Sequence, residues 1–323
     1  MGLSRRQFLG AAAVGAAVAP SLAVGAAPKI PTRPFGKTGR EVPILGFGSG
    51  SRFLMYQDDD EALRALERAI DLGITYVDTA HSYGNGKSEE RIGRLMATRR
   101  KDVTLATKLS ARKADDAKRQ IELSLKWLRT DHLDVLHIHA LAGPADLAAI
   151  EAPDGVLKAL YQAREQKVAR AIGITCHADP AALKTALERH DFDCTQMALN
   201  AALARMAEGR GGMKATPMPA GGFEELALPV AVRKGLGVIA MKVFGQDQIV
   251  GSAPIEKLLT YALSLPVSLA SCGMPRPEFI ERNVEVARHF QPMSEAQRRR
   301  LTDSIAAERK VSMRAFFRDH ADA

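Results

Sequence analysis

Short apolar runs of about five residues alternate along the chain with longer amphipathic stretches. After an entry segment punctuated by Pro and Gly at 28–43, this alternation predicts strands at Ile44–Gly48, Thr75–Asp78, Val103–Lys108, Val135–His139, Ala169–Ile174, Cys194–Leu199, Gly237–Met241 and Val267–Ser271. Helical periodicity follows each strand, near Asp60–Leu72, 88–97, 114–128, 155–167, 180–189, 223–234, 254–264 and 276–289. Repeated strand–helix units indicate a parallel sheet covered by helices.

Eight such units predict one α/β domain over residues 28–323, a (β/α)8 TIM barrel with its site at the carboxyl ends of the strands. A doubly wound open sheet is the alternative, but its Gly-x-Gly-x-x-Gly turn is absent, since Gly46–Gly50 has another spacing. Gly36-Lys37-Thr38 lacks the upstream glycine of a phosphate loop and predicts a hairpin turn. The long connection at 200–222 predicts a cover over the site.

Residues 1–27 differ in kind from the rest of the chain. Ser4-Arg5-Arg6-Gln7-Phe8-Leu9-Gly10 precedes an Ala-rich apolar run, an order typical of a signal peptide. It resembles the twin-arginine (Tat) signal, which implies recognition by that export machinery and a periplasmic location, or a cytoplasmic one if the leader is unused. An uncleaved membrane helix and a chance arginine pair are the alternatives. Pro20 and the Ala and Gly content weaken the first, and no later segment is apolar enough to span a membrane.

The formal charge of +8, from 45 Lys and Arg against 37 Asp and Glu, suits an anionic ligand such as a nucleotide phosphate. The basic residues are scattered, without the stripe and interleaved aromatics of a nucleic-acid surface, so we expect no nucleic-acid partner. The one local cluster, 298–300, follows Ser294 and Gln297, which predict a capping box that opens a solvated helix.

Three cysteines are too few and too widely placed for a disulfide framework. Cys176 follows the fifth predicted strand and Cys194 begins the sixth, so parallel pairing separates them to opposite barrel ends. Cys272 lies three strands away from Cys176. We therefore expect three free, buried thiols.

Four polar residues fall where the second, third and fourth strands reach the barrel mouth. Asp78, Lys108 and His139 end these strands, and Tyr83 follows Asp78 in a tight segment. Singly, each has a structural explanation, such as a cap, packing or a snorkelling side chain. Jointly they indicate chemistry, because a buried lysine needs a carboxylate partner and a cation beside a tyrosine favours release of the phenol proton.

These motifs resemble the aldo-keto reductases. The similarity runs from about Thr32 to Asn283, with the motifs in the family's order: the hairpin at Phe35–Gly39, the Asp and Tyr signature at Tyr76–Glu89, the Lys strand at Val103–Lys108 and the His strand at Leu133–His139. The resemblance implies an NAD(P)H-dependent oxidoreductase that reduces a small aldehyde or ketone to an alcohol. In it, Tyr83 donates the proton, Lys108 and Asp78 assist Tyr83, and His139 orients the carbonyl.

Cofactor positions carried over by the resemblance depart from the family pattern. Gln196 matches the residue that bonds the nicotinamide carboxamide, whereas its usual Ser-Asn partner is Thr175-Cys176 here. The remaining predicted contacts are Gly48 at the end of the first strand, Met241 and Lys242 at the end of the seventh, and Gly273, Arg276 and Asn283 near the eighth. The family's arginine positions for the 2′-phosphate hold Pro275 and Phe279, so Arg276 supports NADP, with NAD left open.

Two other functions remain open at this stage. The altered cofactor contacts allow a non-catalytic nicotinamide-nucleotide-binding homologue that acts as a sensor or partner subunit. His137 and His139, with His81 and His177, allow a metal-dependent barrel hydrolase, although the first strand lacks that class's His-x-His and we expect no metal. We expect His137, inside the barrel, to make structural hydrogen bonds, and Ala140 to leave a roomy substrate pocket.

Overall fold

The computed structural model describes residues 28–203, 222–245 and 249–305. Eight parallel strands close a barrel in chain order: β3 (Leu45–Gly48), β4 (Tyr76–Asp78), β5 (Thr104–Leu109), β6 (Leu133–Ile138), β7 (Ala169–Cys176), β8 (Cys194–Ala198), β9 (Gly237–Met241) and β10 (Leu269–Gly273). The closure joins β10 to β3, with Ala270 beside Leu45. The predicted (β/α)8 barrel is confirmed.

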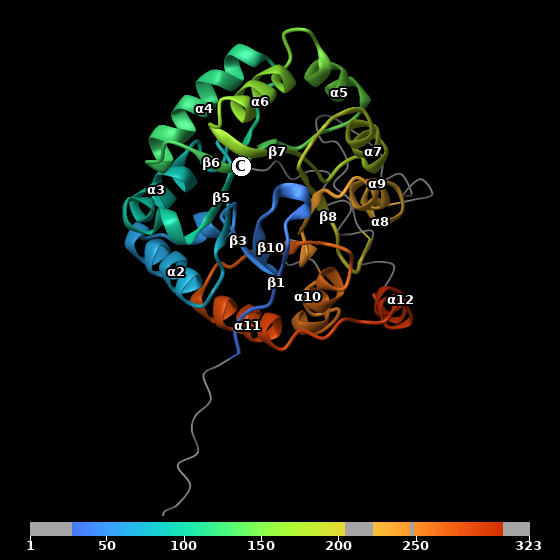
Figure 1. The fold of residues 1–323 in the computed structure, drawn as a ribbon. Coiled ribbons are helices and arrows are strands. Elements are labelled where there is room, and N and C mark those ends of the chain that lie inside the picture. Colours follow the sequence, from blue (N-terminus) through green and yellow to red (C-terminus); the bar gives the residue numbers. More distant parts are fainter. Residues whose placement is uncertain (1–27, 204–221, 246–248, 306–323) are drawn as a thin grey trace, which may run out of the picture.

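Helices ring the barrel on its outside (Figure 1): α2 (Asp59–Asp71), α3 (Lys87–Arg99), α4 (Ala114–Leu128), α5 (Pro144–Glu151), α6 (Val156–Glu165), α7 (Pro180–Arg189), α8 (Phe223–Leu226), α9 (Leu228–Arg233), α10 (Ile255–Leu263), α11 (Pro277–Arg288) and α12 (Glu295–Ser304). Periodicity missed α5, because its apolar residues do not gather on one helical face. The stretch 223–234, expected as one helix, is two short ones. The capping box of α12 is confirmed, since Ser294 Oγ accepts from Gln297 N at 3.3 Å.

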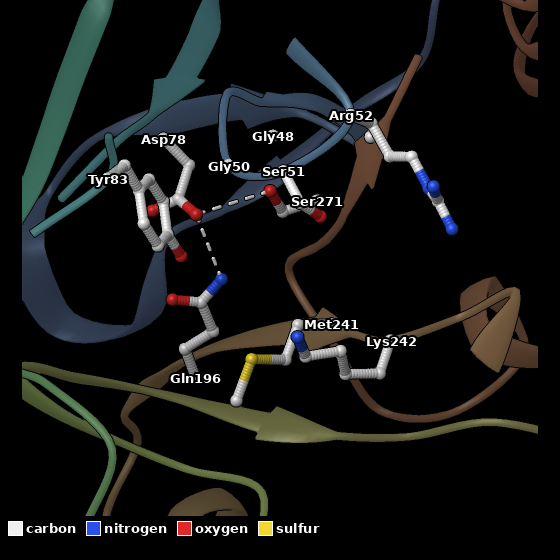
Figure 2. A pocket seen from close by; sticks show the side chains of 11 residues that line it. Gly48, Gly50, Ser51, Arg52, Asp78, Tyr83, Gln196, Met241, Lys242 and Ser271 are labelled. Carbon is white, nitrogen blue, oxygen red and sulfur yellow. Dashed lines mark hydrogen bonds between the residues drawn. The ribbon is translucent and has the colours of Figure 1, made fainter. Parts of the chain in front are cut away.

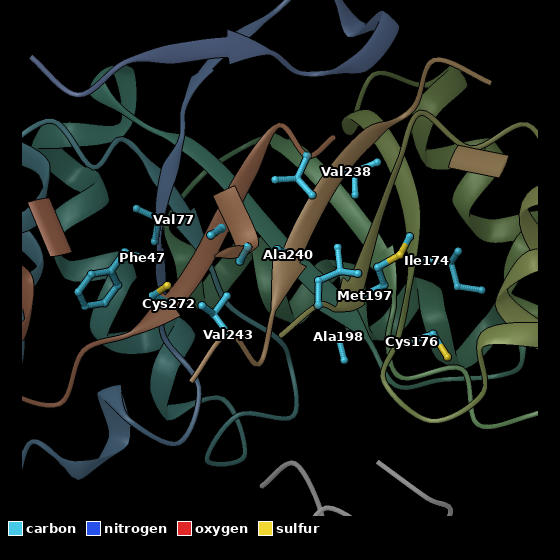
Figure 3. Packing of buried hydrophobic residues seen from close by; sticks show 14 of the residues in the cluster. Phe47, Val77, Ile174, Cys176, Met197, Ala198, Val238, Ala240, Val243 and Cys272 are labelled. Atoms are coloured by element: carbon cyan, nitrogen blue, oxygen red, sulfur yellow. The ribbon is translucent and has the colours of Figure 1, made fainter. Parts of the chain in front are cut away.

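Successive residues of the strands point alternately into the barrel and toward the helices. On β4, Tyr76 and Asp78 point inward, whereas Val77 joins the large apolar cluster between barrel and helices. Figure 3 shows this outer cluster, with Phe47 of β3 and Val238 of β9 among its members. The inward positions are therefore the ones that carry polar chemistry.

A hairpin closes the amino-terminal end of the barrel. Strands β1 (Thr32–Pro34) and β2 (Glu41–Pro43) flank the 3-10 turn η1 (Gly36–Thr38), which confirms the predicted turn. Phe35 fills the barrel floor so closely that a Cβ on Gly237 would lie 2.7 Å from its ring. With the floor packed, only the carboxyl ends of the strands are left for a site.

Several predictions concern residues without a structural description. The leader at 1–27 and most of the proposed cover, 204–221, lie outside the described residues, so both stay predictions, as does the domain boundary after residue 27. Within the described ranges, no helix combines the length and the apolar character needed to cross a membrane. All three cysteines are free and buried, as expected.

Candidate active site

The four predicted catalytic residues meet at the carboxyl end of the barrel. Lys108 Nζ donates to Asp78 Oδ2 at 2.8 Å, across the adjacent strands β5 and β4. The same ammonium lies 5.0 Å from the centroid of the Tyr83 ring. The Tyr83 and His139 rings pack edge to face, with centroids 5.5 Å apart. A phenol, an imidazole and a buried cation thus face one small volume.

The cation is fixed by a fully buried bonding set. The Lys108 side chain is 1% exposed and that of Asp78 is 5% exposed. Lys108 also donates to the carbonyl oxygen of Thr79 at 2.7 Å. Breaking one side of such a buried pair strands a charge in a low-dielectric interior, so each partner holds the other in place.

The turn that carries Tyr83 is built from small and polar residues. Gly84, Asn85 and Gly86 adopt positive φ angles of 59°, 53° and 95°, the region that glycine and asparagine tolerate best. Beside the ring, a Cβ on Gly50 would lie only 3.3 Å from Tyr83. The absence of a side chain at Gly50 therefore leaves one face of the phenol open to the pocket.

His139 directly follows β6 and is held through its backbone. Its carbonyl oxygen accepts from Arg112 Nη2 at 2.8 Å, and Arg112 is itself anchored on Asp146. Ala140, next in the chain, has φ of 51° and donates its N–H to Thr175 Oγ1 at 2.7 Å. Thr175, predicted as a cofactor contact, is fully buried and shapes the turn that positions His139.

Figure 2 shows the pocket that these elements enclose, with Asp78 and Tyr83 at one end and Arg52 and Lys242 at the other. Its lining residues are Gly48, Gly50, Ser51, Arg52, Asp78, Tyr83, Gln196, Met241, Lys242, Ser271 and Gly273. Most of the predicted cofactor contacts are among them. The pocket extends from the Tyr83 hydroxyl to the cations of Arg52 and Lys242, an arrangement that suits a ligand with a polar head and phosphates.

Four lining residues were not predicted from the sequence: Gly50, Ser51, Arg52 and Ser271. Ser271 Oγ donates to Asp78 Oδ2 at 3.5 Å, and Arg52 packs its Cβ and Cγ where a Cβ on Gly273 would lie, 2.8 Å away. Three of the four, Gly50, Ser51 and Arg52, lie in the loop that follows the first barrel strand at the mouth. That position was a usable signal, because the loops after barrel strands build the site.

Unpartnered buried atoms test whether the pocket fits a nicotinamide nucleotide. Gln196 Nε2 donates to Asp78 Oδ2 at 3.1 Å, but Gln196 Oε1 has no partner among the described residues. A nicotinamide carboxamide can supply the missing donor. At α11, Asn283 is 1% exposed, and both its amide atoms lack partners within the described part of the chain. A base edge supplies a donor and an acceptor, so the residues present fit the group.

Arg276 lies apart from the lining of this pocket. It is the exposed N-cap residue of α11, and its guanidinium lies 5.2 Å from the centroid of the Phe279 ring. A cation at a helix amino terminus, where backbone N–H groups also point outward, makes a suitable contact for a phosphate. Arg276 and Asn283 thus share one helix, at the distal end of the proposed cofactor path.

The expectation for His137 was wrong. This side chain is fully buried inside the barrel, and neither ring nitrogen finds a hydrogen-bond partner within the described residues. Burial, followed by the charge of Lys108, holds the pKa of His137 well below its usual value, so the ring is neutral. His81 faces away, with Nδ1 3.3 Å from Ser124 Oγ on α4. Across the described ranges, no three His, Cys, Asp or Glu side chains gather as a metal site would require.

Comparison with known proteins identifies the group to which this barrel belongs. The model of the aldo/keto reductase family matches residues 44–251, more than half of the chain. Aldo-keto reductase YhdN of Bacillus subtilis is 35% identical over 153 residues, which cover 43% of this chain and 44% of the relative. D-threo-aldose 1-dehydrogenase of a Pseudomonas species is 26% identical over 250 residues, 67% of this chain and 70% of the relative.

A solved structure shows the same fold. The aldo/keto reductase of Klebsiella pneumoniae in complex with NADP and acetate superposes with a TM-score of 0.66 at 23% identity, covering 86% of this chain and 95% of that one. At this identity the likeness carries the fold alone, and the chain spans less than half the length of the Bacillus relative. The family model, which contains Asp78, Tyr83, Lys108 and His139 within its match, decides the assignment: the chain belongs to the aldo/keto reductase family.

Proposed function

We propose that the protein reduces a small aldehyde or ketone to an alcohol with a nicotinamide cofactor. The observation that carries this proposal is the placement of the Lys108 ammonium between Asp78 Oδ2, at 2.8 Å, and the Tyr83 ring, at 5.0 Å. A phenol beside a fixed cation is a competent proton donor at neutral pH. The intact set favours this function over a non-catalytic nucleotide-binding homologue.

When bound, the cofactor supplies the hydride that the carbonyl carbon receives. Tyr83 donates a proton to the carbonyl oxygen, and Lys108 stabilises the phenolate that is left. Asp78 keeps the ammonium in place through the pair at 2.8 Å. His139, whose ring packs 5.5 Å from the Tyr83 ring, orients the carbonyl group toward the Tyr83 hydroxyl. Proton donation of this kind contributes about 10²–10⁴ in rate.

Cofactor contacts follow the length of the pocket. Gln196 Oε1 would accept from the nicotinamide carboxamide, Met241 would lie against the nicotinamide, and Gly48 and Gly273 would leave room for the cofactor beside the backbone. Lys242 would neutralise the pyrophosphate, and Asn283 would hydrogen-bond to the adenine. We propose NADP over NAD, because Arg276 adds a second cation toward the adenosine end and a relative of this fold is described in complex with NADP.

The direct experiment follows nicotinamide absorbance in purified protein. We expect tight binding of NADPH, weaker binding of NADH, and loss of reduced cofactor only when an aldehyde or ketone is added. A panel of small aldehydes, ketones and open-chain sugars ranks the substrates. Cofactor binding without carbonyl-dependent oxidation would instead support the nucleotide-binding homologue.

We further propose export by the twin-arginine machinery, on the basis of Arg5 and Arg6 before an apolar run. Cell fractionation should find the full chain in the periplasm. Replacement of both arginines by lysine keeps the charge but removes the receptor-read pair, and should retain the protein in the cytoplasm. Unchanged export of that variant would contradict this proposal.

A further inference from the structure

A fully buried carboxyl group lies behind the turn that carries Tyr83. Glu89, in the first turn of α3, has no exposed surface. Its Oε1 accepts from Thr107 Oγ1 at 2.5 Å, and the Ser124 hydroxyl of α4 lies near enough to lower the pKa of the carboxyl group. Its Oε2 lies 3.8 Å from Nδ1 of His81. Glu89 therefore joins α3, β5, α4 and the turn after β4.

Each of these contacts adjoins a residue of the active site. Thr107 directly precedes Lys108 in β5. The backbone N–H of His81, two residues before Tyr83, donates to the Lys108 carbonyl oxygen at 3.0 Å. On the other side, Ser88 N–H donates to the Tyr83 carbonyl oxygen at 3.3 Å. Any rearrangement at Glu89 is thus passed to the backbone on both sides of Tyr83.

The Trp127 ring supports the same turn from α4. His81 stacks on it with ring centroids 4.9 Å apart and planes at 21°. At the far end of the turn, a Cβ on Gly86 would lie only 2.6 Å from the ring. Trp127 thus touches the residues that flank Tyr83 at both ends, and it is the single tryptophan of the chain.

Glu89 is poised to change its charge near neutral pH. Burial raises the pKa of Glu89 to about 7, against the opposing effects of Thr107, Ser124 and the Lys108 charge. Burial also lowers the pKa of His81. The titratable or charged groups that face the carboxyl group are Lys108 from β5 and His81 from the turn, while α4 contributes the Ser124 hydroxyl and the neutral Trp127 ring.

We propose that Glu89 is a positioning residue whose protonation state sets how Lys108 and the Tyr83 turn act in catalysis. The expected effect of Glu89 on turnover rests on the proposed reductase function. When Glu89 is ionised, a second carboxylate draws on the Lys108 field in addition to Asp78, so Tyr83 is a weaker proton donor. When Glu89 is neutral, more of that field reaches Tyr83. We expect turnover to be about two- to tenfold higher in the neutral state, which corresponds to a change of up to one pKa unit in the donor.

The first test needs no substrate. Tryptophan fluorescence of the cofactor-free full chain is titrated with pH, because Glu89 changes its charge 3.8 Å from the imidazole that stacks on Trp127. In the wild type we expect a transition near pH 7, where Glu89 titrates. Glu89→Gln has no carboxyl group to titrate and should abolish this transition. Glu90→Gln, its exposed neighbour on α3, should leave it in place. Superimposable curves for wild type and Glu89→Gln would overturn the titration of Glu89.

The second test is the pH profile of kcat. The wild type and Glu90→Gln should show a step near pH 7, and Glu89→Gln should keep the low-pH level through that range. A merely structural role for Glu89 would lower stability but leave the step in kcat, and a step retained in Glu89→Gln overturns the proposal.

Should Glu89→Gln fail to fold, Thr107→Val and Ser124→Ala provide a second test. They remove donors that favour the carboxylate and must raise the midpoint of the fluorescence transition. Absence of turnover in the wild type contradicts the reductase function, while the fluorescence titration still decides the proton site.

Discussion

Lys108 and Asp78 form a buried pair in which Nζ lies 2.8 Å from Oδ2, with neither side chain more than 5% exposed. The pair lies on neighbouring strands whose carboxyl ends meet at the barrel mouth. Gln196 and Ser271 add donors to the same carboxylate oxygen. A lysine held this tightly cannot leave the Tyr83 ring, and this fixed relationship is the basis of the proposed chemistry.

Removal of the negative partner tests that pair. Asp78→Asn leaves the Lys108 ammonium buried without its counter-ion, so the free energy of unfolding should fall by about 3–5 kcal/mol. Urea denaturation measures the change. The double variant Asp78→Asn with Lys108→Met removes both charges and should recover part of the loss. A fall below about 0.5 kcal/mol in the single variant would show that the pair contributes little.

Replacement of Asn283 should lower the affinity for the cofactor without lowering the stability of the fold. Its two amide atoms are buried without partners in the described part of the protein, so Asn283→Leu should weaken NADPH binding by about tenfold or more through loss of the bonds to the base. The cofactor-free protein should be no less stable, since a desolvated amide is replaced by an apolar group. Calorimetric titration and urea denaturation give the two quantities, with exposed Glu285→Gln on the same helix as control. Unchanged affinity would place the adenine elsewhere.

His137 offers a stability test inside the barrel. Both ring nitrogens are buried without partners in the described ranges, so His137→Leu removes a desolvation cost of about 1–3 kcal/mol while keeping a similar volume. The free energy of unfolding should be unchanged or higher, as measured by urea denaturation. A clear decrease would mean that the imidazole makes a stabilising bond.

The raised pKa of Glu89 predicts how its contribution to stability depends on pH. The folded-state pKa of about 7 exceeds the ordinary value of 4.5, so between these values the folded protein binds more protons than the unfolded chain. The contribution of Glu89 to the free energy of unfolding is therefore complete below pH 4.5. It is lost as the pH rises through 7, by about 3 kcal/mol in all. The stability of Glu89→Gln relative to wild type should rise by this amount across the window. A constant difference would contradict the shift.

The barrel, and the meeting of the four proposed catalytic residues at its mouth, could be predicted from the sequence because strand periodicity fixes which residues reach the mouth. The hydrogen-bond partners of individual buried polar side chains could not be predicted from the sequence. Thr175 bonds the backbone of Ala140, and His137 bonds nothing among the described residues, because both depend on side chains from strands distant in sequence. Arg52 was not predicted for the same reason: its side chain packs against Gly273 of the distant strand β10, in space that a larger residue would fill. Glu89 was visible in the motif, but its burial was not.

The most direct test of the central claim compares Tyr83→Phe with the wild type in carbonyl-dependent NADPH oxidation and in NADPH binding. The phenyl ring keeps its packing against His139 and Lys108 but has no proton to donate. We predict that kcat falls by about 10²–10⁴ while the dissociation constant of NADPH changes little. Near-full turnover by Tyr83→Phe would contradict the assignment of Tyr83 as the proton donor.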